Sequence, residues 1–329
     1  MQAELYKEIY KASKRSQNEK IKNLSKFIDE VFSAESNNRS IEELTSIIDY
    51  FAYNEYDLRG VLSYQDIAQL RDVLSLLIHS IVAKAMTPFS EYAKHFWRFV
   101  RNNKLSIGLI NLNYDTVFEE AFDCIYPEYL IDYCVDFSNY YETRDNPFNW
   151  WVDPKKPVPE GWNSNRVKII KPHGSINWKY CRNCTSVNLT PWQSGLDFHT
   201  GLFVNDFGIE AGSCPVCGSS VHTLLQQPTH SKNFKNYVFT SLHRHCVVLC
   251  SGAKHIVFIG YSFPEADVHM RGMLKRSFSR SIKITVINPS GEETVRPRYQ
   301  GLTDHLTHIK MGVEEFFEEE NLHKTLIAP

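Results

Sequence analysis

The chain has 329 residues, of which 43% are hydrophobic, and its 36 basic and 38 acidic side chains leave a formal net charge of −2. It can bury a substantial core in one large or two modest domains, and no run of like charges suggests a nucleic acid-binding arm or an acidic tail. The charged N-terminus is unlike a signal peptide, and no apolar run approaches the roughly 20 residues of a membrane span. We therefore expect a globular cytoplasmic protein with no direct nucleic-acid or membrane signal.

Residues 1–103 are predicted to form a helical module. The segment 40–51 opens with the capping-box pair Ser40 and Glu43. Between Ile67 and Ile81, apolar residues recur at the spacing of one helix face. This part of the chain is therefore expected to be α-rich.

The rest of the chain alternates between apolar runs and helical patterns. The runs lie at 105–114, 129–137, 166–174, 255–263 and 282–290, and helical patterns at 234–250 and 265–278 separate some of them. Near-continuous apolarity over such short runs is typical of parallel strands covered on both faces. We predict an α/β fold, in which 104–178 and 229–312 form a Rossmann-like open parallel sheet. Residues 313–329 are expected to be a C-terminal tail with an acidic, peripheral helix.

Four of the eight cysteines form two CxxC pairs, Cys181 with Cys184 and Cys214 with Cys217. Two such hairpins about thirty residues apart can place four thiolates around one zinc ion. Redox-active or merely buried cysteine pairs are the alternative, although a reducing cytosol disfavours stable disulfides. We predict that 179–228 is an inserted zinc-ribbon module whose closed site stabilises the fold without doing chemistry. The other four cysteines are expected to pack in the core.

Polar or small residues follow several of the predicted strands. Because the carboxyl ends of parallel strands share one edge of a sheet, these residues are expected to meet in one crevice there. Taken singly, each has another explanation: the first group could cap the next helix, and the histidine could be structural. The groups are Asn113-Tyr114-Asp115, His173-Gly174-Ser175, Gly260-Tyr261-Ser262 and Asn288-Pro289.

These segments resemble the sirtuin superfamily, and more closely its bacterial sirtuin-like branch than the protein deacylases. The similarity covers residues 104–312 and includes NLNYDTVFEEAF, KPHGSINW, the two CxxC pairs, IVFIGYSFPEAD and INPS, in that order. It implies an NAD-binding core, with NAD as the substrate and zinc as a structural ion.

The resemblance also assigns roles to individual residues. His173 matches the catalytic histidine, and Asn113 matches the asparagine that engages the nicotinamide ribose and positions the ribose or a water. Gly174 is expected to leave room for the ribose. The residues expected to contact the cofactor are Asp115, Tyr114, Gly174, Ser175, Gly260, Ser262 and Asn288.

The chemistry that this implies is cleavage of the bond between nicotinamide and ribose in NAD. Nicotinamide leaves as a neutral molecule, so the enzyme would chiefly stabilise an oxocarbenium-like ribose. His173 would act as a general base, because an imidazole titrates near neutral pH.

One departure from the superfamily concerns the cofactor phosphates. The family's Gly-Ala-Gly-x-Ser loop, where a helix N-terminus cradles the pyrophosphate, has no counterpart before Asn113, and the first glycine of the chain is Gly60. The chain is therefore either a shortened form or a degenerate member. Two lost charge-assisted hydrogen bonds would weaken NAD binding by roughly a hundredfold or more. We expect little or no turnover by these 329 residues alone, and activity once a strand and Gly-rich loop precede them.

A second departure from the superfamily concerns the group that attacks the ribose of NAD. The stretch TLLQQPTHSKNF stands where protein deacylases carry a Phe-Gly-Glu signature on the strand that pairs with the acyl-lysine peptide. Without that peptide, water would attack the ribose. The resemblance therefore favours an NAD hydrolase of the kind associated with antiphage defence, ahead of an NAD-dependent deacylase and of a non-catalytic NAD or ADP-ribose sensor. It also implies self-assembly or a partner protein from a defence system, with the helical module as the natural contact surface.

Overall fold

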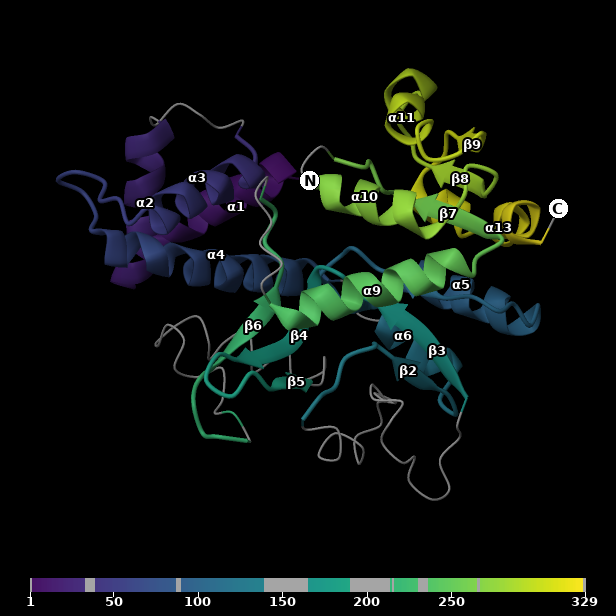
Figure 1. Ribbon diagram of the computed structural model, residues 1–329, viewed down its shortest axis with the longest axis horizontal. Helices are drawn as coiled ribbons and strands as arrows, with labels where there is room; N and C mark the ends of the chain where they lie inside the picture. Colours follow the sequence, from purple (N-terminus) through teal and green to yellow (C-terminus); the bar gives the residue numbers. More distant parts are fainter. Residues whose placement is uncertain are drawn as a thin grey trace.

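The computed structural model describes residues 2–32, 39–86, 90–138, 165–189, 214, 216–229, 236–264 and 267–327. Its first four helices gather at one end of the molecule (Figure 1). They are α1 (Gln2–Arg15), α2 (Glu19–Phe32), α3 (Ile41–Tyr53) and α4 (Tyr64–Ala85). Ser40 caps α3 by accepting the Glu43 backbone N–H at 3.1 Å, and Ser63 with Asp66 forms a full capping box on α4.

The helical end has its own hydrophobic core, formed by the apolar faces of α1 to α4. Phe27, Leu44 and Leu74 are fully buried there. The next helix, α5 (Glu91–Asn102), packs elsewhere, because its Trp97 lies in the larger core with Phe122 of α6 (Val117–Ile125). The packing thus groups α5 with the α/β part of the chain, while the predicted boundary at residue 103 stays a prediction.

Two parallel three-stranded sheets form the α/β part. In the first, the order is β1-β3-β2, from β1 (Leu109–Ile110), β3 (Arg166–Ile170) and β2 (Leu130–Asp132). In the second, the order is β7-β8-β9, from β7 (His255–Ile259), β8 (Lys283–Ile287) and β9 (His305–Ile309). The helix α9 (Tyr237–Ser251) packs on β3 and on α10 (Val268–Ser277), and so connects the two sheets (Figure 1).

An antiparallel sheet, ordered β5-β4-β6, carries the cysteine pairs. Its strands are β4 (Gly174–Cys181), β5 (Val187–Leu189) and β6 (Val221–Leu225). It lies beside α4 and below α9 in Figure 1. The remaining helices of the second half are α11 (Glu292–Tyr299), α12 (Val313–Phe316) and α13 (Glu319–Leu326).

The predicted fold class is confirmed: the chain is an α/β protein with parallel sheets, a helical N-terminal region and an inserted antiparallel module that bears four cysteines. The parallel strands form two hydrogen-bonded sheets among the described residues, where one sheet was expected. The predicted helix starts at Phe234 and Glu265 lie outside those residues, and β9 and α11 were missed. No described helix has the length and apolarity needed to cross a membrane.

Candidate functional site

The segment after β1 turns into α6 through side chains that bond to their own backbone. The side-chain oxygen Oδ1 of Asn111 accepts the backbone N–H of Asn113 at 3.0 Å, and Oδ1 of Asp115 accepts that of Val117 at 3.2 Å. Asp115 thus bonds the first residue of α6 from the position before its N-cap residue Thr116, whereas Asn113 is exposed. Of these two predicted site residues, Asn113 is the one whose side chain faces solvent.

The segment after β3 is tied to the β1 segment by a buried lysine. Lys171 forms an ion pair with Glu119 of α6, with Nζ 2.8 Å from Oε1 and both side chains fully buried. Its Nζ also donates to the backbone carbonyl of Asp115. Burial raises the pKa of Glu119, and the neighbouring Lys171 opposes that rise. Two residues before His173, this lysine fixes the ends of β1 and β3 relative to each other.

Lys171→Met is expected to destabilise the protein by about 3 kcal/mol, because it leaves the Glu119 carboxylate buried without its cation. Urea unfolding followed by tryptophan fluorescence measures this. The double variant Lys171→Met/Glu119→Leu should recover most of the loss, since no charge is then buried. Lys324→Met, in an exposed pair with Glu320 on α13, is the control and should change nothing measurable. Equal losses in the single and double variants would contradict this account.

Tyr114 and Ser175, both predicted to contact the cofactor, have structural contacts here. The Tyr114 hydroxyl donates to the backbone carbonyl of Gln226 at 2.7 Å, and burial raises its pKa. The carbonyl of Tyr114 accepts the Ile176 N–H at 3.0 Å and the Ser175 hydroxyl at 3.3 Å. These bonds join the β1 segment to β4 and to the chain after β6.

Gly174 is required by the local packing of the backbone. Its φ is +80°, and a Cβ atom there would lie 2.0 Å from the backbone oxygen of Leu224. The position therefore demands glycine because β6 passes against it, and the room that it leaves for a ribose stays a prediction. Any larger residue would push β4 and β6 apart.

His173 lies where the segment after β7 meets the segments after β1 and β3. Its side chain is 9% exposed, and its Nε2 lies 3.4 Å from Nε2 of His269 and 4.0 Å from Oδ1 of Asp267. Asp267 stands at the N-cap position of α10 without a side-chain capping bond, and it accepts the Tyr261 hydroxyl at 2.8 Å, which links it to the segment after β7. Asp267 and His269 were missed, although the D-x-H pattern follows directly on the GYSFPEA stretch.

The other predicted cofactor residues lie at the ends of β7 and β8. The backbone N–H of Gly260 donates to Ile287 at 2.9 Å, so the ends of the two strands are adjacent. Ser262 is exposed and its carbonyl accepts from Arg298 at 2.7 Å, while Asn288 is buried. The cofactor roles of Ser262 and Asn288 stay predictions.

The four cysteines of the CxxC pairs come together as the spacing predicts. Their Sγ atoms all lie within 4.8 Å of one another, with 3.6 Å between Cys181 and Cys217 and 3.5 Å between Cys184 and Cys214. A tetrahedral zinc ion with bonds of about 2.3 Å needs sulfur separations of about 3.8 Å. Hydrogen bonds from Ser219 lower the pKa of Cys217 to about 6, which favours the thiolate that a metal needs. The cluster therefore fits zinc.

Metal analysis of the purified protein is expected to give one zinc per chain at these four thiols. Cys214→Ser should release that zinc and unfold the β4-β5-β6 module before the rest of the chain, because a structural site contributes folding free energy. Cys250→Ser, at a buried thiol of α9, should keep the zinc. Carefully purified protein without zinc would contradict the prediction.

The fold and the site define an α/β protein whose strand ends converge on a histidine. Comparison with known proteins agrees, because residues 108–286, more than half of the chain, match the SIR2-like domain. The chain belongs to the SIR2-like domain family. This confirms the resemblance to the sirtuin superfamily, whereas the bacterial defence branch stays a prediction.

Solved structures show the same kind of likeness. A Sir2 homologue in complex with NAD is 13% identical, with 79% of this chain and 74% of that chain covered and a TM-score of 0.43. Two mutant Sir2 homologues in complex with ADP-ribose are 15% and 14% identical, with 82% and 83% of this chain and 81% and 83% of those chains covered, at TM-scores of 0.43 and 0.44. No curated protein matches the chain.

Proposed function

We propose that this protein binds NAD and hydrolyses it to nicotinamide and ADP-ribose, with His173 as general base and Asn113 positioning the ribose or the water. The observation that carries the proposal is the position of His173, whose imidazole lies where the segments after β1, β3 and β7 are bonded together. Family membership supports it, and the Asn113 side chain is exposed on the segment after β1.

The reaction balances without covalent chemistry by the protein. The bond between C1′ of the ribose and the pyridinium nitrogen breaks, and its electron pair goes to that nitrogen, so nicotinamide leaves uncharged. A water oxygen bonds to C1′, and its proton passes to His173 and then to solvent. Correct placement of the water is expected to supply much of the rate enhancement.

Water is favoured over an acyl-lysine peptide because the backbone next to His173 is already bonded. The N–H of Gln226 donates to the His173 carbonyl at 2.8 Å, and its carbonyl accepts the Tyr114 hydroxyl. An added peptide strand needs free backbone groups for its hydrogen bonds. At Gln226 both the N–H and the carbonyl already form hydrogen bonds within the chain.

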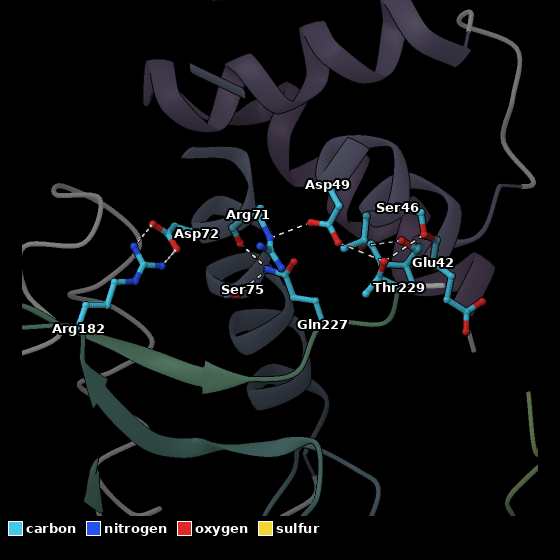
Figure 2. A network of polar contacts seen from close by, with 11 residues as sticks. Glu42, Ser46, Asp49, Arg71, Asp72, Ser75, Arg182, Gln227 and Thr229 are labelled. Atoms are coloured by element: carbon cyan, nitrogen blue, oxygen red, sulfur yellow. Dashed lines mark hydrogen bonds and ion pairs between the residues drawn. The ribbon is translucent and has the colours of Figure 1, made fainter. Parts of the chain in front are cut away.

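The residues that follow are bonded to the helical end of the molecule (Figure 2). The amide of Gln227 donates to the Ser75 hydroxyl of α4 at 2.7 Å. The Thr229 hydroxyl lies 3.2 Å from Oδ2 of Asp49 and 3.1 Å from the Ser46 hydroxyl, both on α3. A peptide lying along this stretch would have to break these contacts, which further supports hydrolysis over deacylation.

The test is nicotinamide release from NAD in the absence of peptide. The assay uses millimolar NAD and compares the 329-residue chain with a version that carries a strand and Gly-rich loop in front of it. Release without peptide, faster in the extended version, is the expected result. A requirement for an acylated lysine peptide would favour deacylation instead, and bound but uncleaved NAD in the extended version would favour a sensor.

A role in antiphage defence, with a partner protein or further copies of the chain on the helical module, is a further part of the proposal. Its support is the sequence resemblance to the bacterial sirtuin-like branch. Expressing the extended version and its His173→Ala variant in phage-challenged bacteria tests this role, since protection should require the histidine.

A further inference from the structure

Three potential metal ligands converge at His173. The ligand atoms are Nε2 of His173, Oδ1 of Asp267 and Nε2 of His269, from the end of β3 and the start of α10. Their side chains are only 9%, 8% and 10% exposed. Two imidazoles and a carboxylate are the ligand set of many zinc and iron(II) sites.

The distances among these atoms suit a shared ion better than direct hydrogen bonds. The two Nε2 atoms are 3.4 Å apart, and each is 4.0 Å from the carboxylate oxygen, whereas good hydrogen bonds to nitrogen span about 2.7–3.2 Å. The point equidistant from the three atoms lies about 2.2 Å from each, against zinc-to-ligand distances of about 2.0–2.2 Å. A shift of a few tenths of an ångström would complete the coordination.

The carboxylate is also held in the orientation that a ligand needs. The Tyr261 hydroxyl donates to Oδ2 of Asp267 at 2.8 Å, which leaves Oδ1 toward the two histidines. A hydrogen-bond donor behind a ligating carboxylate is common in metal sites.

We infer that His173, Asp267 and His269 form a second metal site, specific for a divalent transition-metal ion such as Zn²⁺ or Fe²⁺ and separate from the four cysteines. Three protein ligands leave at least one coordination position for water or a ligand. The ion takes the Nε2 lone pair of His173. If the proposed function holds, bound metal and base catalysis by His173 therefore exclude each other, and added divalent metal inhibits NAD hydrolysis.

Cobalt titration tests the site without NAD. The chain is first given one equivalent of zinc, which the four thiolates take, and Co²⁺ is then added. The expected result is one further Co²⁺ per chain, with d–d absorption bands but no sulfur-to-cobalt charge-transfer band. Asp267→Asn and His269→Ala should each abolish this uptake, and Tyr261→Phe should weaken it by about tenfold.

His305→Ala is the control, because His305 is an exposed histidine on β9, and this variant should still take up one Co²⁺ after zinc loading. Retained zinc and an unchanged near-ultraviolet circular dichroism spectrum show that each variant is folded. No Co²⁺ uptake by the zinc-loaded chain, or uptake by Asp267→Asn and His269→Ala equal to that of the parent, would overturn the inference. Nicotinamide release by the zinc-loaded chain before Co²⁺ is added tests the hydrolase separately, so either idea can fail alone.

Discussion

His173→Ala is expected to lower the rate of nicotinamide release from NAD by about 10²–10⁴-fold, the usual contribution of a general base. The loss should fall on kcat with little change in KM, because the base acts on the water in the transition state and not on bound NAD. Asn113→Ala should also abolish measurable release, since the exposed amide is expected to position the ribose or water. The measurement is nicotinamide formed at millimolar NAD by the version with a strand and Gly-rich loop.

Two comparisons make this result specific. His305→Ala, on the exposed edge of the second parallel sheet, should retain the parent rate. The His173→Ala protein should keep its zinc at the four cysteines and its parent unfolding midpoint to within a few degrees. A variant without His173 that still releases nicotinamide at the parent rate would show that another group is the base.

The second large effect concerns stability and its dependence on pH. Lys179 of β4 is fully buried, where its Nζ donates to the Thr223 hydroxyl at 2.9 Å and to the Ile176 carbonyl at 3.1 Å, and lies 3.5 Å from Nδ1 of His79 on α4. Burial lowers the pKa of Lys179 to about 7. The folded protein therefore holds this amine neutral at a pH where the unfolded chain protonates it.

The direction of the pH dependence follows from the number of protons that Lys179 binds in the folded and unfolded states. Between pH 7 and about 10.4, the ordinary lysine pKa, the unfolded chain carries one more proton at this site than the folded protein. Stability therefore rises with pH in that window, by about 1.4 kcal/mol per unit. Below pH 7 the burial of Lys179 lowers the free energy of unfolding by its full amount, several kcal/mol. From pH 7 to 9, Lys179 alone is expected to add about 3 kcal/mol to the free energy of unfolding.

Urea unfolding of the parent and of Lys179→Met at pH 7, 8 and 9 measures this term as the difference between the two proteins. The difference should change by about 1.4 kcal/mol per pH unit, with the variant favoured most at pH 7. Lys310→Met, at an exposed lysine after β9, should follow the parent at every pH. A difference that stays constant with pH would mean that Lys179 is protonated in the folded state.

Much of the fold follows from local patterns. The five predicted strand runs contain β1, β2, β3, β7 and β8, and the helical pattern of 67–81 lies within α4. These elements were predictable because each buries a face whose period is visible in the sequence. The β9 run, HLTHI, was missed because polar residues alternate with apolar ones at the sheet edge, and its burial is partial. Helix α11 was missed because it is polar and contains Pro297.

The site was only partly predictable, because its contacts join residues far apart in the chain. His173 stood out at the end of a strand, but Asp267 and His269 gain meaning only when α10 brings them to within 4.0 Å of it. Lys171 looked like an ordinary charge beside a proline, and its fully buried partner lies 52 residues earlier. Hydrophobic periodicity carries no information about such pairs.

The sequence by itself determined the fold class, the family and the four-cysteine cluster, since each depends on short-range spacing or on motifs in a fixed order. The tertiary structure decided what surrounds them. It placed the Leu224 carbonyl against Gly174, where only glycine fits, and it brought the Tyr114 hydroxyl to the Gln226 carbonyl. It also divided the parallel strands between two sheets. Those features depend on which strand pairs with which and on how loops pack, and both arise from long-range burial that no local window of the sequence contains.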